Sequence, residues 1–127
     1  MRRIQRATIA VLIGAMGVVS SGAQSASQDP VKLSPQYYTV LAENDRVRVL
    51  EYRLKPGEKE VMHSHPSYVV YFFGDAKLRA MSPDGKTSDT SVTQGEVLLR
   101  DPLSHAVENI GTTELHALLI ERKPEAR

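Results

Sequence analysis

The chain of 127 residues has the length of one domain, and its composition, 41% hydrophobic and 24% charged, is that of an ordinary globular protein. It contains no cysteine, which excludes disulfides, thiolate metal ligands and thiol catalysis. The formal net charge of +1 provides no basic field for nucleic acid, so we expect no nucleic-acid partner.

The first 23 residues have the pattern of a signal peptide. Three arginines within the first six residues precede an apolar run over residues 7–19, and small residues follow the run. Because this run is shorter than the roughly 20 apolar residues that cross a bilayer, a cleaved signal is favoured over a retained membrane anchor. Cleavage is expected before Gln24 or after Ala26, through either the Sec or the Tat route.

Loss of the signal changes the charge of the protein. Removal of residues 1–23 takes away three arginines and no acid, which leaves 13 basic and 15 acidic residues and a net charge of −2. We therefore expect a periplasmic or secreted protein with no membrane partner after signal removal. A homodimer would add buried surface, but a domain of this size does not require one.

The remaining chain divides into an arm and one domain. Residues 24–36 are rich in serine and glutamine and have neither a strand nor a helix period, which predicts a flexible N-terminal arm. From residue 37 to residue 127, short β-branched and aromatic runs alternate with turn residues, which predicts a single all-β domain without a long helix. The expected strands are 37–41, 46–54, 60–65, 68–73, 77–82, 87–93, 97–100, 106–108 and 114–122. So many short antiparallel strands favour a sandwich or a small closed barrel, which leaves few exposed sheet edges.

Two local patterns refine this prediction. Residues 83–85, Pro-Asp-Gly, predict a tight turn that joins the strands on either side, since proline presets φ and glycine accepts a positive φ. Within residues 46–54, Val47 and Val49 alternate with arginines, and then Leu50 starts an apolar series in the other phase. A phase change of this kind indicates a β-bulge or a bend between two sheets.

Two histidines stand near the middle of the domain. His63 and His65 are two residues apart, so on an extended strand they project from one face about 7 Å apart. Imidazoles in that arrangement can converge on one metal ion. A third histidine, His105, follows Gly95 by ten residues and begins an H-x3-N pattern that ends at Asn109.

At these residues the chain resembles the cupin family, specifically its small single-domain members. The first cupin motif is matched by Gly57, His63, His65 and Gly74, and the second by Gly95, Pro102, His105 and Asn109. The resemblance implies a double-stranded β-barrel, or jelly roll, in which the two motifs lie on opposite strands and point inward. It also implies that His63, His65 and His105 bind a divalent transition metal, of which Fe, Ni, Cu and Zn suit imidazole ligands.

The sequence departs from the family at one position that matters chemically. Cupins usually have a glutamate three or four residues after the second histidine, whereas residues 67–70 contain no acid and Tyr68 can align with that position. Glu60, three residues before His63, falls on the alternate face of a regular strand and is a poor replacement unless the strand is bulged. Three neutral imidazoles leave a divalent ion its full charge, which favours a small anionic ligand that binds through oxygen.

Two functions from different classes follow. The first is an exported metal-dependent enzyme, oxygenase-like or isomerase-like, acting on a small anionic molecule with Tyr68 or Tyr71 as acid/base or positioning groups. The alternative is a non-catalytic binding module of the envelope that has lost full metal ligation, or a purely structural barrel. Outside these motifs, His116 is expected in the core or on the surface, and Arg100 is expected on the surface unless it points inward to meet an anion. Asn109 is expected to tie a turn by side-chain hydrogen bonds.

Overall fold

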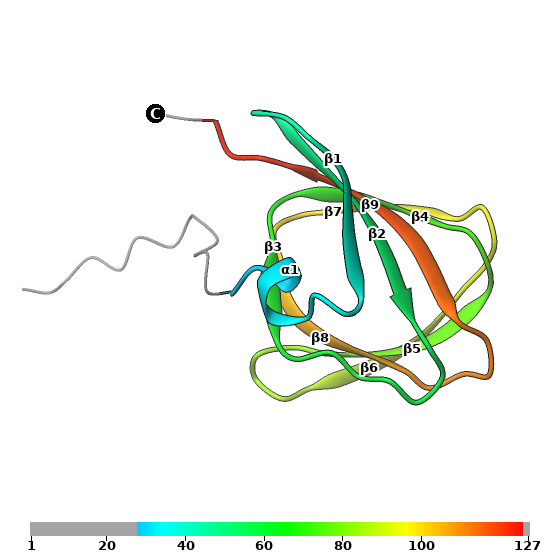
Figure 1. Cartoon of the computed structure of the whole chain (residues 1–127). Coiled ribbons are helices and arrows are strands. Elements are labelled where there is room, and N and C mark those ends of the chain that lie inside the picture. The colour runs from blue at the N-terminus through cyan, green and yellow to red at the C-terminus, as the bar shows by residue number, and fades with distance from the viewer. Residues whose placement is uncertain (1–27, 126–127) are drawn as a thin grey trace, which may run out of the picture.

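The β-branched and aromatic runs form nine strands in residues 28–125, the part of the chain that the computed structural model describes (Figure 1). One short helix, α1, precedes them at Pro30–Leu33. The strands are β1 (Tyr38–Glu43), β2 (Val47–Leu54), β3 (His63–His65), β4 (Tyr68–Phe72), β5 (Ala76–Met81), β6 (Thr87–Val92), β7 (Val97–Arg100), β8 (Leu103–Asn109) and β9 (Leu115–Arg122). The predicted signal peptide and residues 24–27 of the predicted arm lie outside the described residues.

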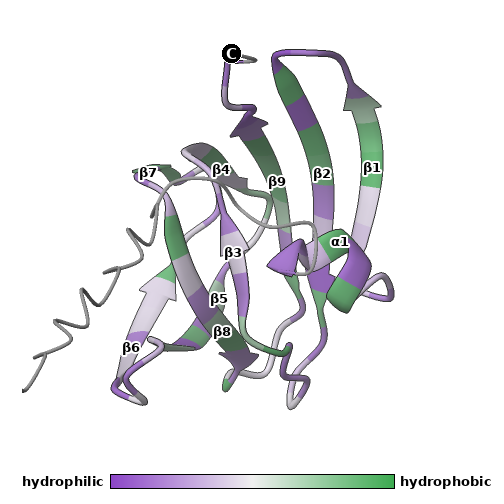
Figure 2. Ribbon diagram, turned by 90° about the vertical axis from the view of Figure 1, so that its left-hand side faces the viewer, coloured by the Kyte–Doolittle hydropathy of each residue, from purple (hydrophilic) through white to green (hydrophobic). Residues whose placement is uncertain are grey.

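The strands pair antiparallel in two sheets that face each other (Figure 2). One sheet has five strands in the order β1-β2-β9-β4-β7, and the other has four in the order β3-β8-β5-β6. Apolar side chains from both sheets fill the space between them, and Leu50, Leu54 and Ala117 are fully buried there. The predicted all-β double-stranded barrel, a jelly roll, is therefore confirmed.

Helix α1 differs from the expectation that this segment has no regular structure. Asp29 caps its N-terminus by accepting a hydrogen bond from the Val31 amide at 3.0 Å, and Pro30 occupies the first turn, where a missing N–H costs nothing. Pro30 and Ser34 are buried, so the second half of the predicted arm packs against the barrel. The helix is one turn long, too short for a sequence period to reveal it.

The predicted bulge in residues 46–54 is wrong. Strand β2 pairs with β9 without a break, and the register shift lies instead on β1, between Val40 and Ala42. The inward face of β2 carries Arg48 in the same phase as Leu50, so the alternation continues through a charged residue. An arginine facing inward on a strand usually has a buried partner, and Arg48 has two, Asp29 and Glu121.

Two predicted turn devices are confirmed. Strands β5 and β6 form a hairpin across residues 83–85, where Gly85 has a φ of +84° that other residues adopt only with strain. The Asn109 amide donates hydrogen bonds to the carbonyls of Leu54 and Thr113, both at 2.8 Å, and its oxygen accepts one from the Gly111 amide at 3.0 Å. This buried side chain therefore fixes the turn between β8 and β9.

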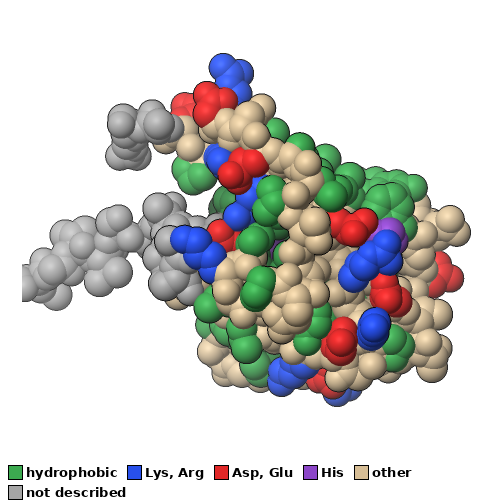
Figure 3. All heavy atoms as spheres, in the orientation of Figure 1, with side chains coloured by type: hydrophobic (Ala, Val, Ile, Leu, Met, Phe, Trp, Pro, Cys, Tyr) green, Lys and Arg blue, Asp and Glu red, His purple; other side chains and the backbone are tan. Residues whose placement is uncertain are grey.

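The outer face of the five-stranded sheet carries exposed apolar side chains. Val97 on β7 is 53% exposed and Leu99 is 80% exposed, while Tyr71 on β4 and Ile120 on β9 are each 38% exposed. In Figure 3, hydrophobic side chains gather over the upper part of the molecule, where this sheet lies in Figure 1. No helix within residues 28–125 is long and apolar enough to cross a membrane.

Candidate metal centre and its cavity

Strand pairing brings the two histidine motifs together. His63 and His65 lie on β3, and His63 pairs directly with His105 on the neighbouring strand β8. One ring nitrogen of each of the three histidines lies within 4.8 Å of the others, so the three can share one ion. His63 and His65 are 1% and 3% exposed, and His105 is half-buried. The three residues named from the sequence therefore form one cluster inside the barrel.

The partners of the Nδ1 atoms orient two of the rings. The Nδ1 of His63 lies 2.9 Å from the Val61 carbonyl, and the Nδ1 of His65 lies 2.8 Å from a carboxylate oxygen of Glu121. Both partners are acceptors, so each Nδ1 carries the proton and each Nε2 has a free lone pair. These two Nε2 atoms lie only 2.9 Å apart.

Two lone pairs at this distance repel each other unless a cation or a proton lies between them. Metal-to-imidazole distances are about 2.0–2.1 Å, so two nitrogens lie about 3 Å apart around an octahedral ion and about 3.4 Å apart around a tetrahedral one. The donor set therefore fits a transition metal. Burial, followed by the charge of neighbouring histidines, lowers the pKa of His63 to about 4 and that of His105 to about 3. Both rings are thus neutral near pH 7, as ligands must be.

An ion-paired network lies behind His65. Glu121, 1% exposed, accepts hydrogen bonds from Arg48 at 2.6 and 2.8 Å through the oxygen that does not contact His65. Arg48 also donates to both carboxylate oxygens of Asp29, at 2.8 and 2.9 Å. A carboxylate on the outer nitrogen of a ligating histidine fixes its tautomer and raises its basicity. Glu121 is in position for this task, and Arg48 holds Glu121 in place.

Glu60 enters the interior, contrary to the sequence expectation. Strand β3 begins only at His63, so residues 60–62 do not follow strand alternation and the Glu60 side chain turns inward, 1% exposed. Its oxygens accept hydrogen bonds from the hydroxyls of Tyr38 at 2.7 Å and Tyr52 at 2.8 Å, and one lies 3.6 Å from the Nδ1 of His63. Burial raises the pKa of Glu60 to about 7. Because this carboxyl lies on the Nδ1 side of His63, it is a neighbour of a ligand and not the missing ligand.

The two tyrosines named from the sequence lie on opposite faces of β4. Tyr68 points inward, 7% exposed, with its ring centroid 4.7 Å from that of His65. Burial raises the pKa of Tyr68 to about 12. Tyr71 points outward and its ring contacts Phe73, so the structure does not bring it to the histidines. His116 also lies outside the cluster, with its Nε2 3.2 Å from a carboxylate oxygen of Glu51.

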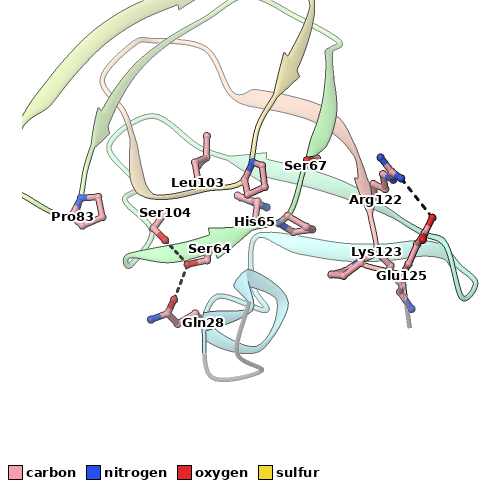
Figure 4. A pocket seen from close by; sticks show the side chains of 13 residues that line it. Gln28, Ser64, His65, Ser67, Pro83, Leu103, Ser104, Arg122, Lys123 and Glu125 are labelled. Carbon is pink, nitrogen blue, oxygen red and sulfur yellow. Dashed lines mark hydrogen bonds and ion pairs between the residues drawn. The ribbon is translucent and has the colours of Figure 1, made fainter. Parts of the chain in front are cut away.

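A cavity of about 250 Å³ opens onto the histidines between the two sheets. His65, His105 and Tyr68 line the end nearest the cluster, apolar side chains line most of the remaining wall, and Arg100 also contributes to the lining. None of the residues that line it is acidic. A larger depression of about 780 Å³ lies on the other side of His65, on the outer surface between Gln28 and the C-terminal residues (Figure 4). The smaller cavity is the one that combines two histidines with an enclosed apolar space.

The residues that sequence reasoning did not predict are Glu60, Glu121 and Arg48. A signal existed for two of them, because Arg48 and Glu121 continue the inward phase of strands β2 and β9. A charge in phase with buried leucines indicates a buried ion pair or a site. No such signal exists for Glu60, whose position depends on the irregular backbone before β3.

No protein-family model and no curated protein matches the chain. Among solved structures, a cupin domain from Bordetella pertussis is 32% identical over 68% of this chain and 92% of its own, with a TM-score of 0.63. An uncharacterised Klebsiella pneumoniae protein with a double-stranded β-helix domain is 17% identical over 71% of this chain and 78% of its own, with a TM-score of 0.57. A predicted oxalate decarboxylase from Thermotoga maritima is 23% identical over 68% of this chain and 79% of its own, with a TM-score of 0.50. The last two likenesses show the fold alone.

Proposed function

Because the chain belongs to the cupin superfamily, we propose that it is a small exported metalloprotein whose three histidines bind one divalent transition metal beside a ligand cavity. Fe, Ni, Cu and Zn suit three imidazoles, whereas Mg and Ca prefer oxygen ligands. The reaction proposed for the cavity is oxygenase-like or isomerase-like, on a small molecule. When bound, the ion supplies Lewis-acid or redox chemistry to a ligand in the cavity.

The observation that carries this proposal is the 2.9 Å separation of the His63 and His65 Nε2 atoms. Each ring already uses its other nitrogen, so both lone pairs are directed to the same point. A structural pair of histidines would normally place a donor against an acceptor. Here the backbone carbonyl and the Glu121 carboxylate hold the Nδ1 protons, so a proton or a metal ion must lie between the two Nε2 atoms, and the third imidazole nearby favours the metal ion.

The chain's own residues have separable roles in this proposal. Glu121 keeps the proton of His65 on Nδ1, and the Val61 carbonyl does the same for His63. Tyr68 keeps its hydroxyl proton at neutral pH, because burial raises its pKa to about 12, and it can donate a hydrogen bond to a ligand in the cavity. The apolar wall excludes water from the ligand's body.

Elemental analysis tests the metal proposal. Purified protein reconstituted with zinc or nickel and then desalted should hold about one ion per chain, and the His63→Ala/His65→Ala variant should hold far less. His116→Ala is the matched control, since His116 lies on the outer face, and it should retain the wild-type content. A wild-type content well below one ion per chain contradicts the proposal.

The alternative function is a non-catalytic binding module. It is favoured by one observation, namely that no acid lines the cavity to complete the ligand set usual in the family. A turnover that disappears in His105→Ala, while the circular dichroism spectrum and melting temperature stay close to wild type, rules out this alternative. Export is tested separately, by the mass and N-terminal residue of protein recovered from a periplasmic or culture fraction.

A further inference from the structure

The wall of the 250 Å³ cavity is uneven in its chemistry. Deep in the barrel it consists of buried apolar residues such as Val70, Phe72 and Leu119. Toward β6 and β7, each an edge strand of its sheet, the polar residues of the cavity wall are exposed: Ser88 and Thr90 from β6 and Arg100 from β7. The cavity therefore has an apolar interior and a polar, cationic opening.

Strand register shows that Arg100 belongs to the inner face of the sheet. It pairs with Tyr68, which is buried and points into the barrel, and the next inward pair is Leu98 with Val70. Leu99, between Leu98 and Arg100, points outward and is 80% exposed. Arg100 therefore shares the inward side of β7 with Leu98, although solvent reaches it because it stands at the opening.

Arg100 differs from the other inward-facing arginine. Arg48 has two acidic partners, whereas no hydrogen bond or ion pair joins the side chain of Arg100 to any residue in the described part of the chain. The hydroxyl of Tyr68 likewise has no hydrogen-bond partner among residues 28–125. Two donors thus line one cavity that contains no acid, and its lining carries a net positive charge.

We infer that the cavity binds a small monocarboxylate with an apolar body, its carboxylate held by Arg100 and the Tyr68 hydroxyl and its body packed in the barrel interior. An apolar cavity of about 150 Å³ accommodates benzene, so 250 Å³ leaves room for one six-membered ring and a carboxylate. A small dianion without an apolar body would make no packing contacts with the apolar interior wall. This carboxylate site deepens the proposed function, because His65 and His105 line the same cavity. It rests on the proposed function for the reaction.

The test is an NMR titration of ¹⁵N-labelled protein, both metal-free and zinc-loaded, with benzoate, benzamide and acetate. Benzoate should shift the amides of residues 98–100 and bind at least about five- to tenfold more tightly than benzamide, which lacks the charge, or acetate, which lacks the body. Arg100→Gln and Tyr68→Phe should each weaken benzoate binding several-fold, and Arg100→Lys should retain most of it. Arg46→Gln, in the exposed β1–β2 turn, is the matched control and should bind as wild type does.

Each result decides between the two proposals. Equal affinity for benzoate and benzamide, unchanged binding in Arg100→Gln, or no benzoate binding to either form overturns the inference. The zinc content of the same samples is measured in parallel. One ion per chain without benzoate selectivity overturns the carboxylate site alone, whereas Arg100-dependent benzoate binding by a chain that takes up no zinc overturns the metal proposal alone.

Discussion

Replacement of Glu121 by glutamine should weaken metal binding while leaving the barrel folded. One carboxylate oxygen of Glu121 accepts from Arg48 at 2.6 Å, and the other accepts from the Nδ1 of His65 at 2.8 Å. An arginine is only a donor, so the amide oxygen of a glutamine must face Arg48 and its NH₂ group must face His65. His65 must then accept at Nδ1, and its proton moves to Nε2, the atom directed at His63.

The expected loss follows from this change of tautomer. Substitution of a carboxylate behind a ligating histidine typically costs about 10- to 100-fold in metal affinity, which corresponds to about 1.4–2.7 kcal/mol. The free energy of unfolding of the metal-free protein should fall by only about 1–2 kcal/mol, since Arg48 keeps both bonds to Asp29 and the amide still accepts from Arg48.

Competition with a chromophoric chelator gives the zinc affinity, and urea denaturation gives the stability. Glu114→Gln is the matched control, because Glu114 pairs with Arg53 on the surface at 2.8 Å and has no contact with the histidines. It should bind zinc as the wild type does. Wild-type zinc affinity in Glu121→Gln would refute the assignment of the His65 tautomer.

Two further predictions concern the metal-free protein. Burial lowers the pKa of His63 to about 4 and that of His105 to about 3 in the folded protein. Because the unfolded chain takes up protons on these histidines at a higher pH than the folded protein does, the free energy of unfolding is highest above pH 6.5 and falls as the pH falls toward those values. Burial raises the pKa of Glu60 to about 7, so this residue acts in the opposite direction. The folded protein keeps the Glu60 proton at a higher pH than the unfolded chain does, and the stability gained from it is lost as the pH rises from 4.5 through 7. Between pH 4.5 and 6.5 the unfolded chain binds two more protons on the histidines and one fewer on Glu60, so the free energy of unfolding should rise by about 1.4 kcal/mol per pH unit. Urea titrations at several pH values measure this slope, and a flat or falling profile would contradict it. Leu50→Ala, at a fully buried position, should lower the free energy of unfolding by about 2–5 kcal/mol, whereas Leu99→Ala, at a position 80% exposed, should change it by less than about 0.5 kcal/mol. Equal melting temperatures for the two variants would contradict the burial of Leu50 in the core.

The parts of the site that the sequence predicted are those encoded over short distances. The spacing of His63 and His65 places both on one face of a strand, and the pattern that begins at His105 adds the third histidine once β3 and β8 pair. The hairpin at residues 83–85 and the turn held by Asn109 are likewise local. In such cases a few neighbouring residues determine the geometry, so the sequence pattern is sufficient to predict it.

The parts that were not predicted depend on contacts between distant segments. Glu121 and Arg48 stand in the inward phase of their strands, where a charge is favourable only if it has a buried partner, and each is the other's partner across 73 residues of chain. Glu60 faces inward because residues 60–62 leave strand geometry, which no period reports. Tyr71 belongs to the same aromatic run as Tyr68, but its odd spacing from Tyr68 places it on the outer face of the sheet.

The network behind His65 also bears on the order in which the protein is assembled. His65 and Glu121 are 56 residues apart in the chain, and Arg48 and Glu121 are 73 apart. Contacts of such long sequence separation form late, after the costly closure of the intervening loops. A chain truncated before β9 keeps all three histidines but has nothing to select the tautomer of His65. We therefore expect high metal affinity to be acquired only when the final strand docks, so that metal uptake reports completion of the fold.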